Sequence, residues 1–195
     1  MKDTPDITKI TQTEVYVFEK RRKMKSTALD DLRWLIQVRS KDSLRHILQY
    51  VHIRADKAEA TDGIRLHQST HEQLVGLPDG VYKVLLNTEG KVIIELNKEE
   101  TGTFPNCDAV IPDKDDLKGS FKATTGNAKY NNTVSKIIYR LGKGGGPPID
   151  ENYLADVIKH HPEEKMTVRY GDELSAIRFD CGTRMAIVMP IRLED

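Results

Sequence analysis

The chain has 195 residues, of which 38% are hydrophobic and 31% are charged, enough for a core beneath a heavily charged surface. Thirty Lys and Arg residues balance thirty Asp and Glu residues, so no overall basic field favours nucleic acid. Cys107 and Cys181 lie far apart with no Cys-x-x-Cys pair, which argues against a zinc site. With no signal peptide and no apolar run near about 18 residues, we expect a cytoplasmic protein that makes no membrane contact.

In the first half, residues 1–14 are polar and are expected to form a loose leader. Val15–Phe18 suits a strand. An amphipathic helix is predicted from Leu29 to about Val38, with Ser26 or Thr27 as its N-cap. Four further strands are predicted in two hairpins, Ile47–Ile53 with Ala58–Gln68 and Val81–Leu86 with Val92–Leu96.

In the second half, the charged stretch Asp113–Gly119 marks an internal boundary. A second amphipathic helix is predicted for Glu151–His160, capped by Asp150. The turn Lys143–Pro148 lacks the Gly-Lys-Ser/Thr ending of a phosphate-binding loop. The remaining strands are predicted at Phe121–Thr124, Ser135–Leu141, Met166–Tyr170, Ala176–Phe179 and Met185–Met189. A helix followed by two strands therefore occurs twice, which predicts an α+β fold of antiparallel sheets with two amphipathic helices.

Three short motifs stand out. Ala60–Leu66 reads Ala-Thr-Asp-Gly-Ile-Arg-Leu, a strand with a kink at Asp62-Gly63. Phe104–Pro112 reads Phe-Pro-Asn-Cys-Asp-Ala-Val-Ile-Pro. Met185–Leu193 reads Met-Ala-Ile-Val-Met-Pro-Ile-Arg-Leu, a strand that stops at a proline. By itself, this last stretch fits either an edge strand whose tail seals its own core or one wall of a groove for an apolar peptide.

Together, in this order, the three motifs resemble the bacterial DNA polymerase sliding clamp, the β subunit of polymerase III. The resemblance covers roughly Leu29–Leu193 with gaps and implies a DNA-clamp-like fold. It likens residues 15–112 to the middle domain of a clamp subunit and residues 113–195 to the end of the last domain. We expect the two halves to form one compact domain, which lacks the family's helix between Gln68 and Val81.

The resemblance also implies a hydrophobic cleft that docks clamp-binding peptides of polymerases, clamp loaders or repair proteins. By motif match, the cleft residues are Leu48, Thr61, Gly63, Ile64, Arg65, Leu66, Pro105, Ala109, Val110, Ile187, Val188, Met189, Pro190, Ile191, Arg192 and Leu193. The chain departs from the family at Cys107-Asp108, where an aromatic and a basic residue are common, and at Glu194-Asp195, which follow the usual last residue.

Duplex DNA is a further candidate partner, because clustered cations release counterions when they bind phosphates. The candidate contacts are Lys20, Arg21, Arg22, Lys23, Lys25, Arg33 and Arg39. A solvated surface is the usual explanation of such a basic run, and phosphate contact is the alternative.

No Ser/His/Asp set and no paired carboxylates at a recognisable spacing occur, so we predict a protein that is not an enzyme, with no metal and no cofactor. The main hypothesis is a peptide-docking accessory protein of DNA replication or repair. A DNA-encircling processivity ring formed by self-assembly of about six chains is the alternative, and a degenerate clamp relative with an unrelated binding role is the third.

Overall fold

The computed structural model describes residues 7–10, 14–20, 27–124, 130–159 and 165–191. The chain packs into two compact units. The first contains Met1–Gly63 and Gln68–Pro105, and the second contains Ile64–His67 and Asn106–Asp195. The chain passes from the first unit to the second after Pro105, whereas we expected the boundary at residue 112 from the sequence. Each unit has its own core.

The sheet of the first unit is antiparallel at every pairing whose register is known. In spatial order its strands are β1 (Ile7–Ile10), β2 (Val15–Glu19), β7 (Lys91–Leu96), β6 (Gly80–Asn87), β3 (Val51–Arg54) and β4 (Lys57–Thr61). Both predicted hairpins are confirmed, β3 with β4 and β6 with β7. Strand β1 lies inside the segment that we expected to be a loose leader.

Three short helices accompany this sheet: α1 (Ala28–Ile36), the 3-10 helix η1 (Ser43–Gln49) and α2 (Glu72–Val75). Thr27 caps α1 as predicted, because its side-chain oxygen accepts from the backbone N–H of Asp30 at 3.3 Å. The apolar stripe of α1, together with Trp34, is buried against strands β2, β4 and β7. Helix α2 stands where the sequence predicted no helix, and η1 replaces the start of the strand expected at Ile47–Ile53.

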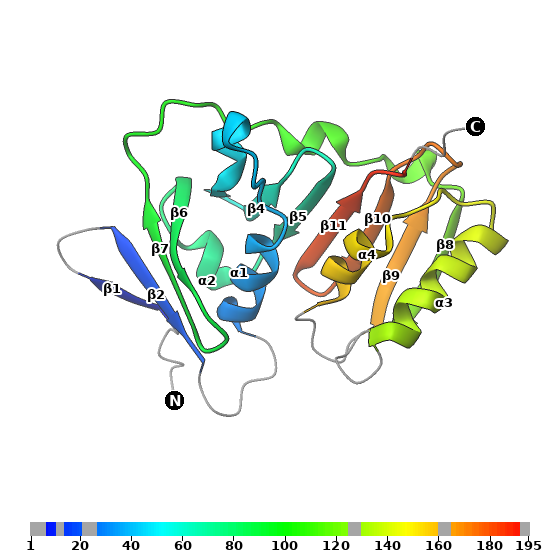
Figure 1. Cartoon of the computed structure of the whole chain (residues 1–195), viewed down its shortest axis with the longest axis horizontal. Helices are drawn as coiled ribbons and strands as arrows, with labels where there is room; N and C mark the ends of the chain where they lie inside the picture. Colours follow the sequence, from blue (N-terminus) through cyan, green and yellow to red (C-terminus); the bar gives the residue numbers. More distant parts are fainter. Residues whose placement is uncertain (1–6, 11–13, 21–26, 125–129, 160–164, 192–195) are drawn as a thin grey trace. The chain divides into compact units, whose positions relative to one another are not determined.

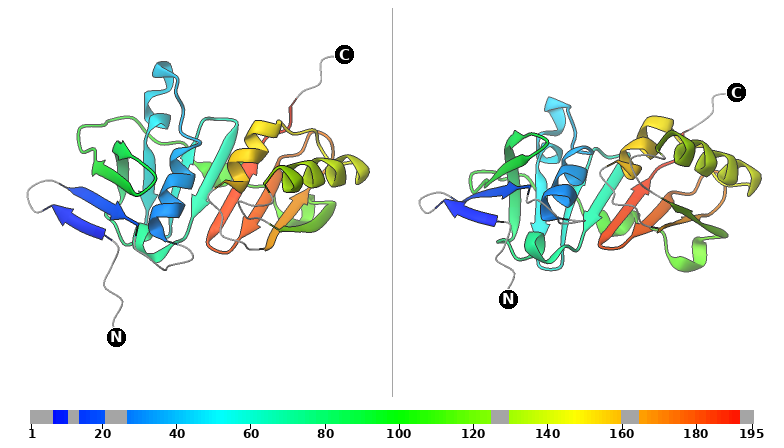
Figure 2. Two further views of the ribbon diagram at one scale, coloured as in Figure 1. Left: turned by 60° about the horizontal axis from the view of Figure 1, so that its bottom comes forward. Right: turned by 90° about the horizontal axis from the view of Figure 1, so that it is seen from below.

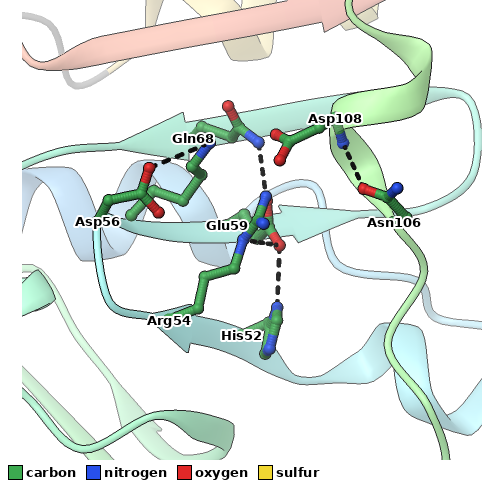
Figure 3. Close-up of polar contacts among 8 residues, drawn as sticks. His52, Arg54, Asp56, Glu59, Gln68, Asn106 and Asp108 are labelled. Atoms are coloured by element: carbon green, nitrogen blue, oxygen red, sulfur yellow. Dashed lines mark hydrogen bonds and ion pairs between the residues drawn. The ribbon is translucent and has the colours of Figure 1, made fainter.

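A buried carboxylate of the first unit, that of Glu59, is held by several polar partners (Figure 3). Glu59 is 1% exposed and accepts hydrogen bonds from Gln68 Nε2 at 2.7 Å and from Arg54. Its Oε1 also lies 2.9 Å from Nδ1 of His52, whose ring stacks on Phe104 at 4.6 Å. A buried charge needs such partners, so this cluster fixes β3, β4 and the end of β5 (Arg65–Ser69) in one arrangement.

In the second unit, strands β11 (Arg184–Val188), β10 (Ile177–Cys181), β9 (Lys165–Tyr170) and β8 (Gly119–Thr124) follow one another in an antiparallel sheet. The start of β5 lies on the other side of β11. Strand β11 therefore has a neighbour on both sides, so the edge-strand interpretation of Met185–Leu193 was wrong. The α+β class and the antiparallel pairing that we predicted are confirmed.

Helices α3 (Tyr130–Lys143) and α4 (Glu151–Ile158) lie on one face of this sheet (Figures 1 and 2). Asp150 caps α4, as predicted, by accepting from the backbone N–H of Asn152 at 2.7 Å. The strand expected at Ser135–Leu141 is wrong, because these residues belong to α3. Val134, Ile137 and Leu141 fall at helical spacing and are buried, so the 3.6-residue period decides the structure here.

The glycine-rich turn after α3 encloses the ring of Tyr170. A Cβ at Gly144 would lie 2.0 Å from the hydroxyl oxygen of Tyr170, and one at Gly146 would lie 2.7 Å from its ring. A Cβ at Gly119 on β8 would meet the same side chain. Tyr170 is 9% exposed. These glycines therefore make room for an aromatic side chain.

Candidate peptide-binding surface of the second unit

Two of the sequence motifs meet in the second unit. The backbone N–H of Met189, just after β11, donates to the carbonyl oxygen of Ile64 at 3.0 Å. Two residues further on, the N–H of Ile191 donates to the carbonyl oxygen of Pro148 at 3.1 Å. The chain after β11 is thus fixed by hydrogen bonds on both sides of Pro190, which itself has no N–H to donate.

Three large apolar side chains in this region reach solvent. Ile64 is 43% exposed, Met189 40% and Ile191 38%. In contrast, Ile187 and Val188 of the same motif are only 1% and 0% exposed, and Leu66 is 2% exposed. These three side chains therefore belong to the core beneath the surface. The motif therefore divides into a buried half and an exposed half. We call Ile64, Arg65, Met189, Pro190 and Ile191 the docking surface.

Arg65 is the polar member of the docking surface, and it is held by α4. Its Nη1 donates to Asp156 Oδ2 at 2.7 Å, and its guanidinium carbon lies 4.3 Å from the ring centroid of Tyr153. The Arg65 side chain is 10% exposed. A charge-assisted hydrogen bond and a cation–π contact act on one guanidinium, so Arg65 is rigid and links β5 to α4.

Sequence reasoning did not assign Tyr153 or Asp156 to the candidate site. Their positions, three residues apart on a predicted helix, place them on the same helix face. That spacing was the available signal, but the partner of the face can be identified only from the fold.

Four of the predicted cleft residues belong to the first unit. Leu48 and Thr61 are buried, whereas Gly63 and Pro105 are exposed. Gly63 has φ +90°, and its N–H donates to Oγ1 of Thr61 at 3.0 Å. The Asp-Gly pair of the motif is therefore a backbone requirement, because a left-handed φ favours glycine.

Ala109 and Val110 lie in the 3-10 helix η2 (Cys107–Val110) of the second unit. Both are exposed, and the Val110 side chain reaches 51%. Arg192 and Leu193 lie outside the described residues. The roles of the predicted cleft residues in binding stay predictions.

The cations named as candidate DNA contacts fall into two groups. Arg21, Arg22, Lys23 and Lys25 lie outside the described residues. Lys20 is exposed, while Arg33 Nη1 donates to the carbonyl oxygen of Glu89 at 3.1 Å and Arg39 Nη1 to that of Gln49 at 2.7 Å. Burial lowers the pKa of Arg39. Arg33 and Arg39 thus each have a partner within the first unit, and DNA contact by them stays a prediction.

Within the described part of the chain, no helix is both long and apolar enough to cross a membrane.

The sequence matches neither a protein-family model nor a curated protein. Solved structures do match. The sliding clamp of Bacillus subtilis aligns with a TM-score of 0.55 and 10% identity, covering 96% of this chain and 74% of that chain. The Helicobacter pylori β clamp, solved with a DNA ligase peptide, aligns with a TM-score of 0.58 and 11% identity, covering 94% and 67%.

A sliding clamp of Bartonella birtlesii, solved with griselimycin, aligns with a TM-score of 0.52 and 18% identity, covering 85% of this chain and 64% of that chain. At such identities the similarity concerns the backbone. The resemblance inferred from the three motifs is thus confirmed at the level of architecture, and this chain has the fold of the bacterial DNA polymerase III β sliding clamps.

Proposed function

We propose that this chain is a non-enzymatic, sliding-clamp-like accessory protein of DNA replication or repair that docks short peptides of polymerase, clamp-loader or repair proteins. The docking surface is the part of the chain that we assign to this binding. The function does not require that the chain encircle DNA.

The observation that carries the proposal is the hydrogen bond between Met189 N–H and Ile64 O. It brings together two motifs that are distant in sequence and that were chosen for their resemblance to a peptide-binding cleft. Beside this bond, Ile64, Met189 and Ile191 keep large apolar side chains partly in solvent. Exposed apolar side chains that are grouped on a rigid backbone favour a binding role over a role in the core.

The chemistry of the surface suits an apolar peptide with a polar backbone. Met189 is flexible and polarisable, so it can pack against different anchors. Burying one Leu or Phe side chain of a partner contributes about 1.5–3 kcal/mol. Two anchors therefore contribute about 3–6 kcal/mol. Backbone hydrogen bonds and further contacts along the peptide have to supply the rest of the roughly 8 kcal/mol of a micromolar Kd and offset the cost of ordering the peptide. The DNA ligase peptide bound to the Helicobacter pylori clamp named above supports this class of ligand.

The test is calorimetric titration of the protein with a short peptide that carries spaced Leu and Phe anchors. The unmodified protein is expected to bind with roughly micromolar affinity. Met189→Ala should weaken binding by about tenfold, because part of the anchor's buried contact area is lost. Its melting temperature should change little, since Met189 is 40% exposed in the free protein.

Leu174→Ala is the matched control. Leu174 belongs to the same unit and is 75% exposed, but it lies in the turn between β9 and β10 and outside all three motifs. It should leave the affinity unchanged. Equal affinities for Met189→Ala and the unmodified protein, or an unmodified protein that gives no binding heat, would refute the assignment.

A further inference from the structure

A second feature, separate from the docking surface, is a run of sequence with one sign of charge. Residues 117–149 contain six basic residues, Lys118, Lys122, Lys129, Lys136, Arg140 and Lys143, and no acidic residue. The chain as a whole has a formal net charge of zero, so the positive charge of this segment differs strongly from that of the rest of the chain. It includes both β8 and α3. A field of one sign attracts ligands of the opposite sign.

The structure places a cavity of about 390 Å³ between β8 and α3, within the second unit. Three of the six cations line it: Lys122 from the strand, and Lys136 and Arg140 from the helix. Lys136 and Arg140 are four residues apart, so their side chains leave the same face of α3. No carboxylate is among the lining residues. The volume lies within the range of small-molecule sites, about 300–1,000 Å³.

Arg140 is already held in position. Its Nη1 donates to the carbonyl oxygen of Lys122 at 3.2 Å, and its guanidinium carbon lies 5.3 Å from the ring centroid of Phe121. None of Lys122, Lys136 and Arg140 forms an ion pair with a carboxylate of the described residues. The three cations therefore repel one another in the free protein, and a bound anion would relieve that repulsion.

The remaining lining groups indicate which anion fits. Asn132 and Thr124 contribute exposed polar side chains at the wall. The ring of Phe121 is engaged by Arg140 and by Tyr170, whose centroid is 6.2 Å away, so it offers poor stacking for a base. A guanidinium, two ammonium groups and neutral donors around a small volume match the oxygens of a phosphate group.

We propose that the β8–α3 cavity is a binding site for a compact phosphate monoester, with Lys122, Lys136 and Arg140 as its anchoring cations. The site does not depend on peptide docking. The same phosphate chemistry occurs in a small metabolite and at the end of an oligonucleotide, and the limited volume of about 390 Å³ favours the small molecule. A nucleic-acid backbone is the competing source.

The experiment titrates the protein with glycerol phosphate at constant ionic strength and follows the amide signals of β8 and α3 by NMR. The expected result is saturable binding at roughly millimolar ligand. Lys136→Gln should weaken binding by about tenfold, because a charge-assisted contact is lost. Lys143→Gln removes the same charge from the same helix but does not line the cavity, and it should change the affinity less than about threefold.

Melting curves of both variants check that they fold. Signals that shift without saturating, or an equal loss of affinity in the two variants, would show general charge attraction and overturn the proposal. A short single-stranded oligonucleotide without terminal phosphates is the second ligand. If the oligonucleotide shifts these amide signals to saturation while glycerol phosphate does not, the cations bind a nucleic-acid backbone, and the proposal of a small-molecule site is wrong.

Discussion

Met189 donates its backbone N–H to the carbonyl oxygen of Ile64 at 3.0 Å. This single bond joins a C-terminal motif to a motif in the first third of the chain, and the side chains of both residues remain about two-fifths exposed. Neighbouring backbone is held by the contact of Arg65 with α4. The backbone of the docking surface is thus held by hydrogen bonds before any partner arrives, which lowers the ordering cost of binding.

Removing the negative charge of Asp156 should destabilise the protein, because Arg65 would lose its charged partner at 2.7 Å while its side chain stays 90% shielded. We expect Asp156→Asn to lower the free energy of unfolding by about 1–3 kcal/mol in a urea titration. Glu173→Gln, at an exposed turn of the same unit, should cost less than about 0.5 kcal/mol. Equal stabilities for the two variants would mean that the Arg65–Asp156 pair adds nothing to folding.

The glycine-rich turn around Tyr170 leaves no room for an added methyl group at Gly144. Gly144→Ala places a Cβ 2.0 Å from Tyr170 Oη and is expected to cost about 1–3 kcal/mol of stability by overpacking. Adding Tyr170→Phe removes that oxygen and should recover part of the loss. Gly142→Ala, whose Cβ meets nothing within 4 Å, should be neutral or stabilising by up to about 1 kcal/mol. Thermal melts of the three variants measure these effects. An unchanged melting temperature for Gly144→Ala would contradict the close packing of Gly144 against Tyr170.

Alkaline pH should weaken the first unit through Tyr82. Burial, followed by the negative potentials of Tyr16, Glu14 and Asp79, raises the pKa of the Tyr82 phenol. Because its pKa is raised in the folded state, the Tyr82 phenol stays protonated to a higher pH in the folded protein than in the unfolded chain. The resulting stability is fully present below the unfolded pKa of about 10 and is lost as the pH rises further.

Tyr82→Phe tests this effect. It removes the hydrogen bond from Tyr82 to the Pro78 carbonyl oxygen, so it costs about 1 kcal/mol at neutral pH. Its stability should nevertheless fall less steeply above pH of about 10 than that of the unmodified protein in urea titrations. Tyr139→Phe, at a 68% exposed position, should keep the original slope. If all three proteins show the same slope, the buried phenol does not determine the alkaline limit.

Local signals were sufficient for much of the fold. The N-caps Thr27 and Asp150 and both hairpins follow from side-chain hydrogen bonding and from alternating apolar patterns, which act over a few residues. The helix α3 was missed because Ile137, Ile138 and Tyr139 favour strands by propensity. Burial of one face at a 3.6-residue period outweighs that preference.

The candidate sites depend on long-range contacts, and this limited their prediction. The three motifs indicated which segments matter, but not which atoms join them. The hydrogen bond from Met189 N–H to the carbonyl oxygen of Ile64 links residues that are 125 positions apart, and no local pattern reports such a contact. The partners of Arg65 on α4 and the cavity beside α3 required the packing of elements that are distant in sequence.

The number of chains that associate in solution distinguishes the peptide-docking hypothesis from the hypothesis of a DNA-encircling ring. The carbonyl oxygens of Lys122 and Thr124, on terminal strand β8, accept hydrogen bonds from Arg140 and Thr133 of α3. These contacts occupy groups that strand pairing with another chain would need. We therefore expect sedimentation equilibrium to give a mass near 22.1 kDa, that of one chain. A mass about six times larger would support the ring instead.

Peptide binding at the docking surface is tested most directly by mapping a bound peptide on the protein by NMR. A peptide with spaced Leu and Phe anchors is added to the unmodified, isotope-labelled protein, and the backbone amide shifts are followed to saturation. We expect the largest changes at Ile64, Arg65, Leu66, Met189 and Ile191, with a roughly micromolar Kd. Saturable changes that leave these amides unmoved, or no changes at all at several hundred times that concentration, would contradict peptide binding at the docking surface.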